Sequence, residues 1–272
     1  MDFVKMEGLG NDFVVVDGPI DVSPEDVRRW CDRRRGIGAD GVLEVTPVDP
    51  GTVKMRYWNA DGGAAEMCGN GLRCVALLAH LRGWVESPSF VVETEMGERP
   101  VEVRPDGTVR ALLGWASGDG DSAGSIPGGE ESGLEHPGVE MTAVQLHGVE
   151  VHRVSVGNPH AVTFVDDPAE APVREIGPRI ERDPMFPVGT NVEFATVVAP
   201  DRIAVRVWER GVGETLACGT GAAATAYAGH RLGLTDAKVT VDLVGGPLLV
   251  DLQDDEAWIE GPAAVVFTGS VV

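Results

Sequence analysis

The sequence predicts a mixed α/β (α+β) fold made of two pseudo-symmetric halves, with the active site in the cleft between them. Each half is expected to be a strand-rich, barrel-like shell around one central helix. Three observations lead to this prediction: an internal repeat, short β-rich runs that alternate with few helical segments, and a cysteine placed before a helix in each half.

The repeat is found when the chain is compared with itself at an offset of 150 residues. The run RYWNADGGAAEMCGNG begins at Arg56, and the run RVWERGVGETLACGTG begins at Arg206. Eleven of the 37 positions in 48–84 are identical to their counterparts, among them a tryptophan and a cysteine. A shorter echo pairs GLGNDFVVVD, from Gly8, with SVGNPHAVTFVDD, from Ser155. Such self-similarity indicates two related halves.

The repeat predicts an N-terminal half over residues 1–116 and a C-terminal half over residues 139–262. The last strand, over residues 263–272, is expected to return to the first half. Residues 117–138 are rich in glycine, serine and acidic residues and offer almost nothing to bury. That composition predicts a surface loop or linker between the halves.

Helices and strands are predicted from capping signals and apolar patterns. Residues 69–81 and 219–231 each follow a cysteine and end near a glycine, and a shorter helix is expected over 24–35 with Ser23 as its N-cap. Runs of β-branched and apolar residues predict the strands. These are 12–17, 42–45, 53–58, 89–95 and 101–105 in the first half, and 160–167, 191–198, 202–208, 238–244 and 247–252 in the second.

Composition excludes several classes of protein. The formal net charge of −21 is opposite to the basic surface that binding to nucleic acid requires. No run is long enough to span a membrane, and the first residues lack the basic region and cleavage site of a signal peptide. With 43% hydrophobic residues, the chain is expected to be a globular cytoplasmic protein without a membrane or nucleic-acid partner.

The four cysteines form neither a CxxC pair nor the spacing of a zinc site, so no metal is expected. They are Cys31, Cys68, Cys74 and Cys218. A buried, unreactive thiol is the commonest role of a single cysteine, and we expect it for Cys31 and Cys74.

Cys68 and Cys218 differ from the other two because each immediately precedes a predicted helix and a Gly-x-Gly run. The glycines leave backbone N–H groups accessible to an anion, and the positive end of a helix favours the thiolate form of a cysteine. Two such thiols on either side of a carbon acid can remove a proton from one face and return one to the other, which inverts a stereocentre. The alternative is that the repeat preserves packing only.

This two-base chemistry needs no cofactor, and none is expected. A pyridoxal enzyme is disfavoured because the three lysines, Lys5, Lys54 and Lys238, do not lie beside an obvious phosphate-binding loop.

Six motifs, in order along nearly the whole chain, resemble those of the diaminopimelate epimerase family. They are KMEGLGNDFVVVDG, GIGADG, YWNADGGAAEMCGNGLRC, VSVGNPHAV, GTNVEF and WERGVGETLACGTGAA. The resemblance implies a cofactor-independent enzyme that interconverts LL- and meso-diaminopimelate in lysine and peptidoglycan biosynthesis. It also implies a pseudo-symmetric two-domain fold and a homodimer.

The same resemblance implies that Cys68 and Cys218 are the two acid/base residues, that His160 assists one thiol and that Glu209 assists the other. It implies that Glu209 binds an ammonium group and that Arg210 binds the distal carboxylate of the substrate through two parallel hydrogen bonds. The other implied substrate-binding residues are Gly69, Asn70, Gly219 and Thr220 at the helix starts, and Asn11, Asn59, Asn158 and Asn191 as polar contacts. Without the motifs, these would be interpreted as turn formers, a structural histidine and a surface ion pair.

The chain departs from the family pattern at four positions. Glu7 stands where a histidine is usual, Gly63 replaces a serine, and Gly41 stands where some members carry a glutamine that contacts substrate. Phe267 takes the place of a tyrosine that helps some members to dimerise. None of the four removes an expected acid/base group.

Other interpretations of the two thiols stay open at this point. A related racemase on the same scaffold could act on histidine, proline or hydroxyproline, although Glu209 and Arg210 favour a substrate with a second zwitterionic end. A protein of a different class, which binds amino acids without catalysis or works in thiol redox chemistry, could also use two facing cysteines. A thiol hydrolase built on Cys68 and His160 would leave the second thiol unexplained.

Overall fold

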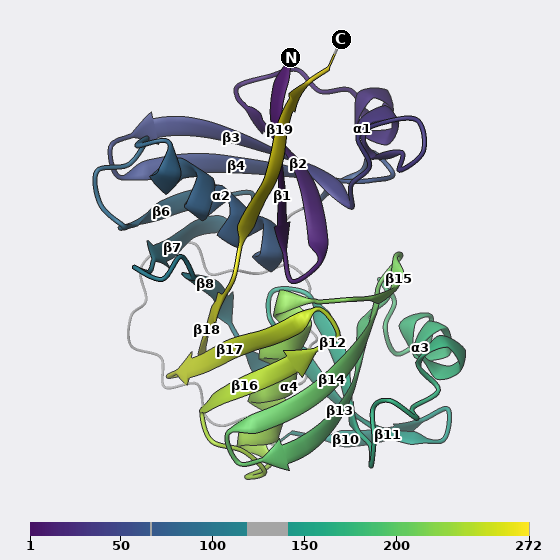
Figure 1. Cartoon of the computed structure of the whole chain (residues 1–272). Coiled ribbons are helices and arrows are strands. Elements are labelled where there is room, and N and C mark those ends of the chain that lie inside the picture. The colour runs from purple at the N-terminus through teal and green to yellow at the C-terminus, as the bar shows by residue number, and fades with distance from the viewer. Residues whose placement is uncertain (66, 119–140, 272) are drawn as a thin grey trace. The chain divides into compact units, whose positions relative to one another are not determined.

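Two strand-rich units contain the residues that the computed structural model describes, which are 1–65, 67–118 and 141–271 (Figure 1). The N-terminal unit comprises Met1–Leu112 and Glu260–Val272, and the C-terminal unit comprises Leu113–Ile259. Most of the linker predicted over 117–138 lies outside the described residues. The domain boundaries expected from the sequence stay a prediction.

The N-terminal unit is a mixed sheet packed around one helix. Its elements are β1 (Asp2–Gly8), β2 (Asn11–Asp17), α1 (Pro24–Cys31), β3 (Gly41–Asp49), β4 (Thr52–Asn59), β5 (Ala64–Ala65), α2 (Gly69–Leu81), β6 (Ser89–Thr94), β7 (Gly97–Val103), β8 (Val109–Trp115) and β19 (Ala264–Ser270). The pairs β2–β3 and β4–β6 are parallel, whereas β1–β2, β1–β19, β3–β4, β4–β5, β6–β7 and β7–β8 are antiparallel. The C-terminal strand β19 thus completes the sheet beside β1.

The C-terminal unit repeats this arrangement. Its elements are β9 (Ser117–Gly118), β10 (Ala143–Leu146), β11 (Val149–Ser155), β12 (Pro159–Phe164), α3 (Val173–Glu181), β13 (Asn191–Ala199), β14 (Arg202–Glu209), β15 (Gly213–Thr215), α4 (Gly219–Arg231), β16 (Lys238–Leu243), β17 (Gly246–Gln253) and β18 (Glu256–Gly261). The pairs β12–β13 and β14–β16 are parallel, and β11–β12, β13–β14, β14–β15 and β16–β17 are antiparallel. The chain passes between the units within β8 and β18.

The two units match element by element. Strand β3, strand β4 and helix α2 begin 150 residues before β13, β14 and α4, and the parallel pair β2–β3 corresponds to β12–β13. Figure 1 shows one labelled helix among the strands of each sheet, α2 in the N-terminal unit and α4 in the C-terminal unit. The predicted mixed α/β, pseudo-symmetric fold is therefore confirmed.

The central helices are buried because they carry small or apolar side chains on nearly every face. In α2 every residue from Gly69 to Ala79 is buried, and in α4 every residue from Gly219 to Gly229. Helix α2 packs against β1, β3, β4 and β7, and α4 packs against β11, β12, β13 and β17. Both predicted helix ranges are confirmed, and the glycines beyond them, Gly83 and Gly233, have φ values of +66° and +71°.

The prediction for α1 was wrong at its C-terminal end. The helix begins after its predicted N-cap, Ser23, whose side chain accepts a hydrogen bond from Asp26 N–H, but it ends at Cys31 and not at residue 35. Asp32 explains the difference because its carboxylate accepts hydrogen bonds from the N–H groups of Arg34 and Arg35 at 2.8 and 2.9 Å. A short acidic side chain that binds nearby backbone in this way competes with the helix.

Helix α3 was missed by the sequence analysis, because Gly177 and Pro178 inside it are poor helix formers. Packing explains its presence. A Cβ atom on Gly177 would lie 2.8 Å from Trp208 Cβ, so the absent side chain lets the helix lie directly on β14. The first two residues of the predicted linker, Ser117 and Gly118, form strand β9 and pair with β11.

Burial of the central helix predicts a large difference between two leucines of α2. Leu72 is fully buried, whereas Leu81 is 61% exposed. The substitution Leu72→Ala is expected to lower the free energy of unfolding by about 2–5 kcal/mol because it removes packed methyl groups and leaves a cavity. The matched control Leu81→Ala should change it by no more than about 0.5 kcal/mol. Urea denaturation measures both values, and equal losses would contradict the central position of α2.

Candidate active site

Each of the two candidate thiols caps its helix. Cys68 has an extended backbone (φ −146°, ψ 109°), and its Sγ accepts a hydrogen bond from Gly71 N–H at 3.3 Å. Cys218 repeats this geometry (φ −125°, ψ 115°) and accepts from Gly221 N–H at 3.4 Å. The sulfur therefore takes the place of the oxygen of a serine or aspartate N-cap. Both thiols consequently lie at the positive end of a buried helix.

The second glycine of each Gly-x-Gly run is required by close contacts. A Cβ atom on Gly71 would lie 3.0 Å from Leu43 Cδ2, and a Cβ atom on Gly221 would lie 2.8 Å from Glu193 Oε1. The first turn of each helix thus lies directly against the first parallel strand pair of its unit. The same glycine faces an apolar side chain in one unit and a carboxylate in the other.

The other two cysteines are buried, as expected. Cys31 lies at the end of α1 and Cys74 inside α2. Burial raises the pKa of the Cys31 thiol to about 11, and burial also raises the pKa of Cys74. Neither thiol has the helix-capping position of Cys68 and Cys218.

Polar side chains surround Cys68 in the N-terminal unit. Its thiol lies 3.8 Å from Asn11 Oδ1, which also accepts a hydrogen bond from Asn70 Nδ2 at 3.2 Å. Asp40 Oδ2 accepts a hydrogen bond from Asn11 Nδ2 at 2.9 Å. Because a carboxylate only accepts, Asp40 fixes the amide of Asn11 with its oxygen toward Cys68. Two predicted substrate-binding residues, Asn11 and Asn70, are thus brought together with Cys68.

A buried arginine binds this cluster through Asn70. Arg73, on the first turns of α2, is fully buried and donates hydrogen bonds to Asn70 Oδ1 at 2.9 Å and to the carbonyl of Pro262 at 3.2 Å. Desolvation lowers its pKa from the usual value for arginine. Arg73 and Asp40 were not identified from the sequence, although they lie inside the quoted motifs YWNADGGAAEMCGNGLRC and GIGADG respectively.

Asn59 and Gly41 lie side by side at the ends of β4 and β3, where they pair in the sheet. The Asn59 side chain accepts a hydrogen bond from Tyr57 Oη at 2.7 Å. A Cβ atom on Gly41 would lie 2.5 Å from both Trp58 O and Tyr57 Cε2. A side chain at position 41 would therefore require these neighbours to shift, which explains why glycine stands there.

Carboxylates surround Cys218 in the C-terminal unit. Burial raises the pKa of the Cys218 thiol well above its usual value, and the charges of Glu209 and Glu193 raise it further. Burial also raises the pKa of Glu209, while hydrogen bonds with Thr215 and Cys218 oppose that rise. The positive helix end was expected to favour a thiolate at both cysteines. At Cys218, burial and the charges of two acidic neighbours act against the helix end and favour the protonated thiol.

His160 lies behind this thiol and is fully buried. Its Nδ1 atom lies 2.7 Å from Glu193 Oε1, and its Nε2 atom lies 3.0 Å from Asn158 Oδ1. Asn158 Nδ2 in turn lies 3.4 Å from Thr220 Oγ1, which is 3.5 Å from Cys218 Sγ. A chain of polar contacts therefore joins Glu193 to the thiol. Sequence reasoning missed Glu193, whose only signal was a charged residue inside the apolar run NVEFATVV.

Asn191 and Arg210 are brought together at the start of β13 and the end of β14. Asn191 Oδ1 accepts a hydrogen bond from Arg210 N–H at 2.9 Å, and its Nδ2 donates to the carbonyl of Pro159 at 3.3 Å. The Arg210 guanidinium donates to the carbonyl of Val188 at 3.2 Å. Asn191 therefore holds the backbone that carries Arg210.

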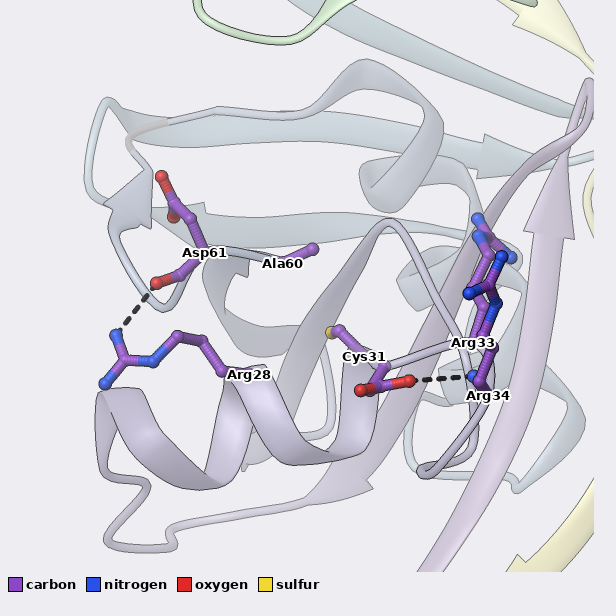
Figure 2. Close-up of a pocket in the computed structure, with 7 residues that line it drawn as sticks. Arg28, Cys31, Arg33, Arg34, Ala60 and Asp61 are labelled. Atoms are coloured by element: carbon purple, nitrogen blue, oxygen red, sulfur yellow. Dashed lines mark hydrogen bonds between the residues drawn. The ribbon is translucent and has the colours of Figure 1, made fainter.

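A separate open pocket lies beside α1, with a volume of about 430 Å³ (Figure 2). Its lining residues are Arg28, Cys31, Asp32, Arg33, Arg34, Ala60 and Asp61. None of the predicted site residues lines it. Arg28 donates to the carbonyl of Asp61 at 3.0 Å, and Arg33 binds Asp12 and Asp40 at 2.7 and 2.6 Å, so these two cations already have partners.

In 1–65, 67–118 and 141–271, no three or more His, Cys, Asp or Glu side chains gather as a metal-ligand group. No helix within the same ranges is both long enough and apolar enough to cross a membrane.

The acidic surroundings of Cys218 predict how its reactivity depends on pH. Only the thiolate is alkylated, so the rate of alkylation at Cys218 should rise at a pH well above that of an ordinary cysteine. Glu209→Gln removes a negative charge beside the sulfur and is expected to shift that rise to lower pH. Iodoacetamide labelling followed by peptide mass spectrometry gives the profile. Glu175→Gln, at an exposed position on α3, is the control, and an unshifted profile for Glu209→Gln would contradict the assigned cause.

Comparison with known proteins supports one family. The diaminopimelate epimerase family model matches residues 3–117 and 153–272. A diaminopimelate epimerase of Thioalkalivibrio sulfidiphilus is 44% identical, with 100% of this chain and 99% of the relative covered. One of Desulforudis audaxviator is 45% identical with the same coverage. A solved structure, a probable proline racemase from Agrobacterium radiobacter K84, shares the fold with a TM-score of 0.71 at 16% identity, covering 100% of this chain and 92% of that one. The chain is therefore an isomerase that belongs to the diaminopimelate epimerase family.

Proposed function

We propose that this protein interconverts LL-2,6-diaminopimelate and meso-2,6-diaminopimelate, a step of lysine and peptidoglycan biosynthesis. The observation that carries the proposal is the pair of helix-capping thiols, Cys68 and Cys218, at equivalent positions of two matching units. The relatives that match this chain from end to end are named for the same substrate.

In the proposed mechanism the two sulfurs act on one α-carbon from opposite faces. A thiolate takes the α-proton, so that a C–H bond breaks and an S–H bond forms. The second thiol gives its proton to the other face, which forms the new C–H bond and leaves a thiolate. The stereocentre is inverted, and the two cysteines have exchanged protonation states.

The starts of the two helices would stabilise the charge that develops during this exchange. In this proposal the backbone N–H groups of Gly69 and Asn70 in α2, and of Gly219 and Thr220 in α4, bind the reacting carboxylate. Donors that are fixed before the reaction stabilise an enolate-like state more than water does, because they need no reorganisation.

The assisting groups are assigned within the same proposal. Glu209 accepts the proton of Cys218 when that thiol must become a base, and the hydrogen bond between them supports this role. His160 is assigned to the other thiol, and within its own unit it contacts Asn158 and Glu193.

The distal end of the substrate would be held by Glu209 and Arg210, through its ammonium and carboxylate groups respectively. Asn11, Asn59, Asn158 and Asn191 complete the proposed polar contacts. The side chain of Asn191 already binds the Arg210 backbone, so its contribution includes placing that arginine.

A racemase for proline or hydroxyproline is the second candidate. The likeness to the probable proline racemase supports a common fold. At 16% identity it says nothing about the substrate of this protein. Glu209 and Arg210 favour diaminopimelate, because proline has no second zwitterionic end for them to bind. Binding without catalysis and thiol redox chemistry would each leave the acidic surroundings of Cys218 without a purpose.

Removal of either thiol tests the function. Wild-type protein is expected to convert LL-diaminopimelate to the meso form without added cofactor. Chiral chromatography measures this conversion. Cys68→Ala and Cys218→Ala should each lower the rate by about 10³-fold or more, because each removes one of the two proton-transfer groups. Cys31→Ala, at a buried cysteine outside the site, should stay active. Turnover that survives either site substitution would sink the two-base mechanism, and turnover of proline but not diaminopimelate would sink the substrate.

We further propose that the enzyme acts in the cytoplasm as a homodimer, as the family resemblance implies. Sedimentation equilibrium should then give twice the chain mass of 28.7 kDa. A single species at the monomer mass would contradict the dimer and would leave the proposed chemistry untouched.

A further inference from the structure

Glu193 is a buried carboxylate to which neither the motifs nor the proposed chemistry assigns a role. It is fully buried, and its Oε1 atom lies 2.7 Å from His160 Nδ1. Its Oε2 atom has no hydrogen-bond partner among the described residues. Burying a carboxylate with one oxygen unsatisfied is costly, so its presence calls for a physical explanation.

The equivalent place in the N-terminal unit contains no charge. Phe13 pairs with Gly41 in β2–β3 as His160 pairs with Asn191 in β12–β13, which makes Phe13 the counterpart of His160. By the same register Leu43 is the counterpart of Glu193, and both Phe13 and Leu43 are fully buried. The fold therefore accepts an apolar pair at this place. The ionisable pair of the C-terminal unit is not needed to build the sheet.

The contacts of His160 decide where its protons lie. A net negative charge on the buried pair would be disfavoured by desolvation and by Glu209, and burial accordingly raises the pKa of Glu193. The geometry fits a neutral pair that holds two protons. One lies between Oε1 and Nδ1, on either atom, and the other lies on Nε2, because Nε2 faces the amide oxygen of Asn158, which can only accept.

The proton on Nε2 sets the direction of the Asn158 amide. Nε2–H donates to Asn158 Oδ1 at 3.0 Å, which turns the amide NH2 toward Thr220 at the start of α4. In the N-terminal unit the counterpart Asn11 has the opposite direction, since Asp40 accepts from its NH2 group and its oxygen faces Cys68. The two units thus present a donor at one helix start and an acceptor at the other.

We propose that Glu193 is a positioning residue that keeps a proton on His160 Nε2 and thereby presents the Asn158 amide as a hydrogen-bond donor at the Cys218 site. Resting on the proposed function, this donor joins the N–H groups of α4 in binding the carboxylate of the substrate. Glu193 itself touches neither substrate nor thiol.

The first test is spectroscopic and needs no substrate. In wild-type protein labelled with 15N-histidine, the chemical shifts of the His160 ring are expected to show a protonated Nε2. Glu193→Leu removes the partner of Nδ1 and should give a mixture of tautomers. Glu193→Gln can donate its amide hydrogen to Nδ1 and should keep the wild-type form. Glu44→Gln, a buried carboxylate of β3 in the other unit, is the control and should leave the His160 signals unchanged.

The second test is kinetic. With LL-diaminopimelate, Glu193→Leu is expected to raise KM about tenfold or more with a smaller change in kcat, because a hydrogen bond to a charged group is lost. Glu193→Gln should recover most of the loss. The double variant His160→Phe with Glu193→Leu reproduces the Phe13 and Leu43 pair, and its melting temperature shows whether the site still folds.

A bare Nε2 in the wild-type protein would overturn the proposal even if no variant folds. It would also be overturned if Glu193→Leu kept a single Nε2–H tautomer and an unchanged KM. Failure of the proposed function looks different, since the wild-type protein would then not turn over diaminopimelate while the histidine signals would still report the tautomer.

Discussion

The rest of this structure depends on one interaction, the hydrogen bond that a cysteine sulfur accepts from an N–H group in the first turn of a buried helix. The cap fixes each thiol at the positive end of α2 or α4, and the glycine that donates the hydrogen bond is also the residue that lets the helix approach the sheet. Each unit builds the same strands around this helix. The fold therefore delivers a thiol at the N-terminal end of a buried helix twice in one chain.

The two copies keep the same backbone and differ in what lies behind the sulfur. Behind Cys68 are Asn11, Asn70 and the buried guanidinium of Arg73. Behind Cys218 are Glu193, Glu209 and a histidine that bridges to Asn158, and these carboxylates favour the protonated thiol. An enzyme that must hold one thiol and one thiolate can use this inequality, because identical surroundings would favour the same form at both sites.

Much of the fold could be predicted from the sequence because the repeat, the caps and the apolar patterns are local signals. The ranges of α2 and α4 followed from a cysteine at one end and a glycine at the other. Helix α3 could not be predicted, since its stability depends on packing against Trp208 in a strand 31 residues after Gly177. The partners Asp40, Arg73 and Glu193 were missed for the same reason. A buried polar residue acquires its role from contacts that only the folded chain brings together.

The central claim is that two different groups handle the two protons, and isotope partitioning tests it most directly. LL-diaminopimelate would be converted to a small extent in D2O, and the product and the recovered substrate would be separated and analysed by mass spectrometry. Two bases predict one deuterium at the inverted α-carbon of the meso product and almost none in the recovered substrate, because the group that removes hydrogen is not the group that delivers deuterium. Equal labelling of product and recovered substrate from the start would contradict the account.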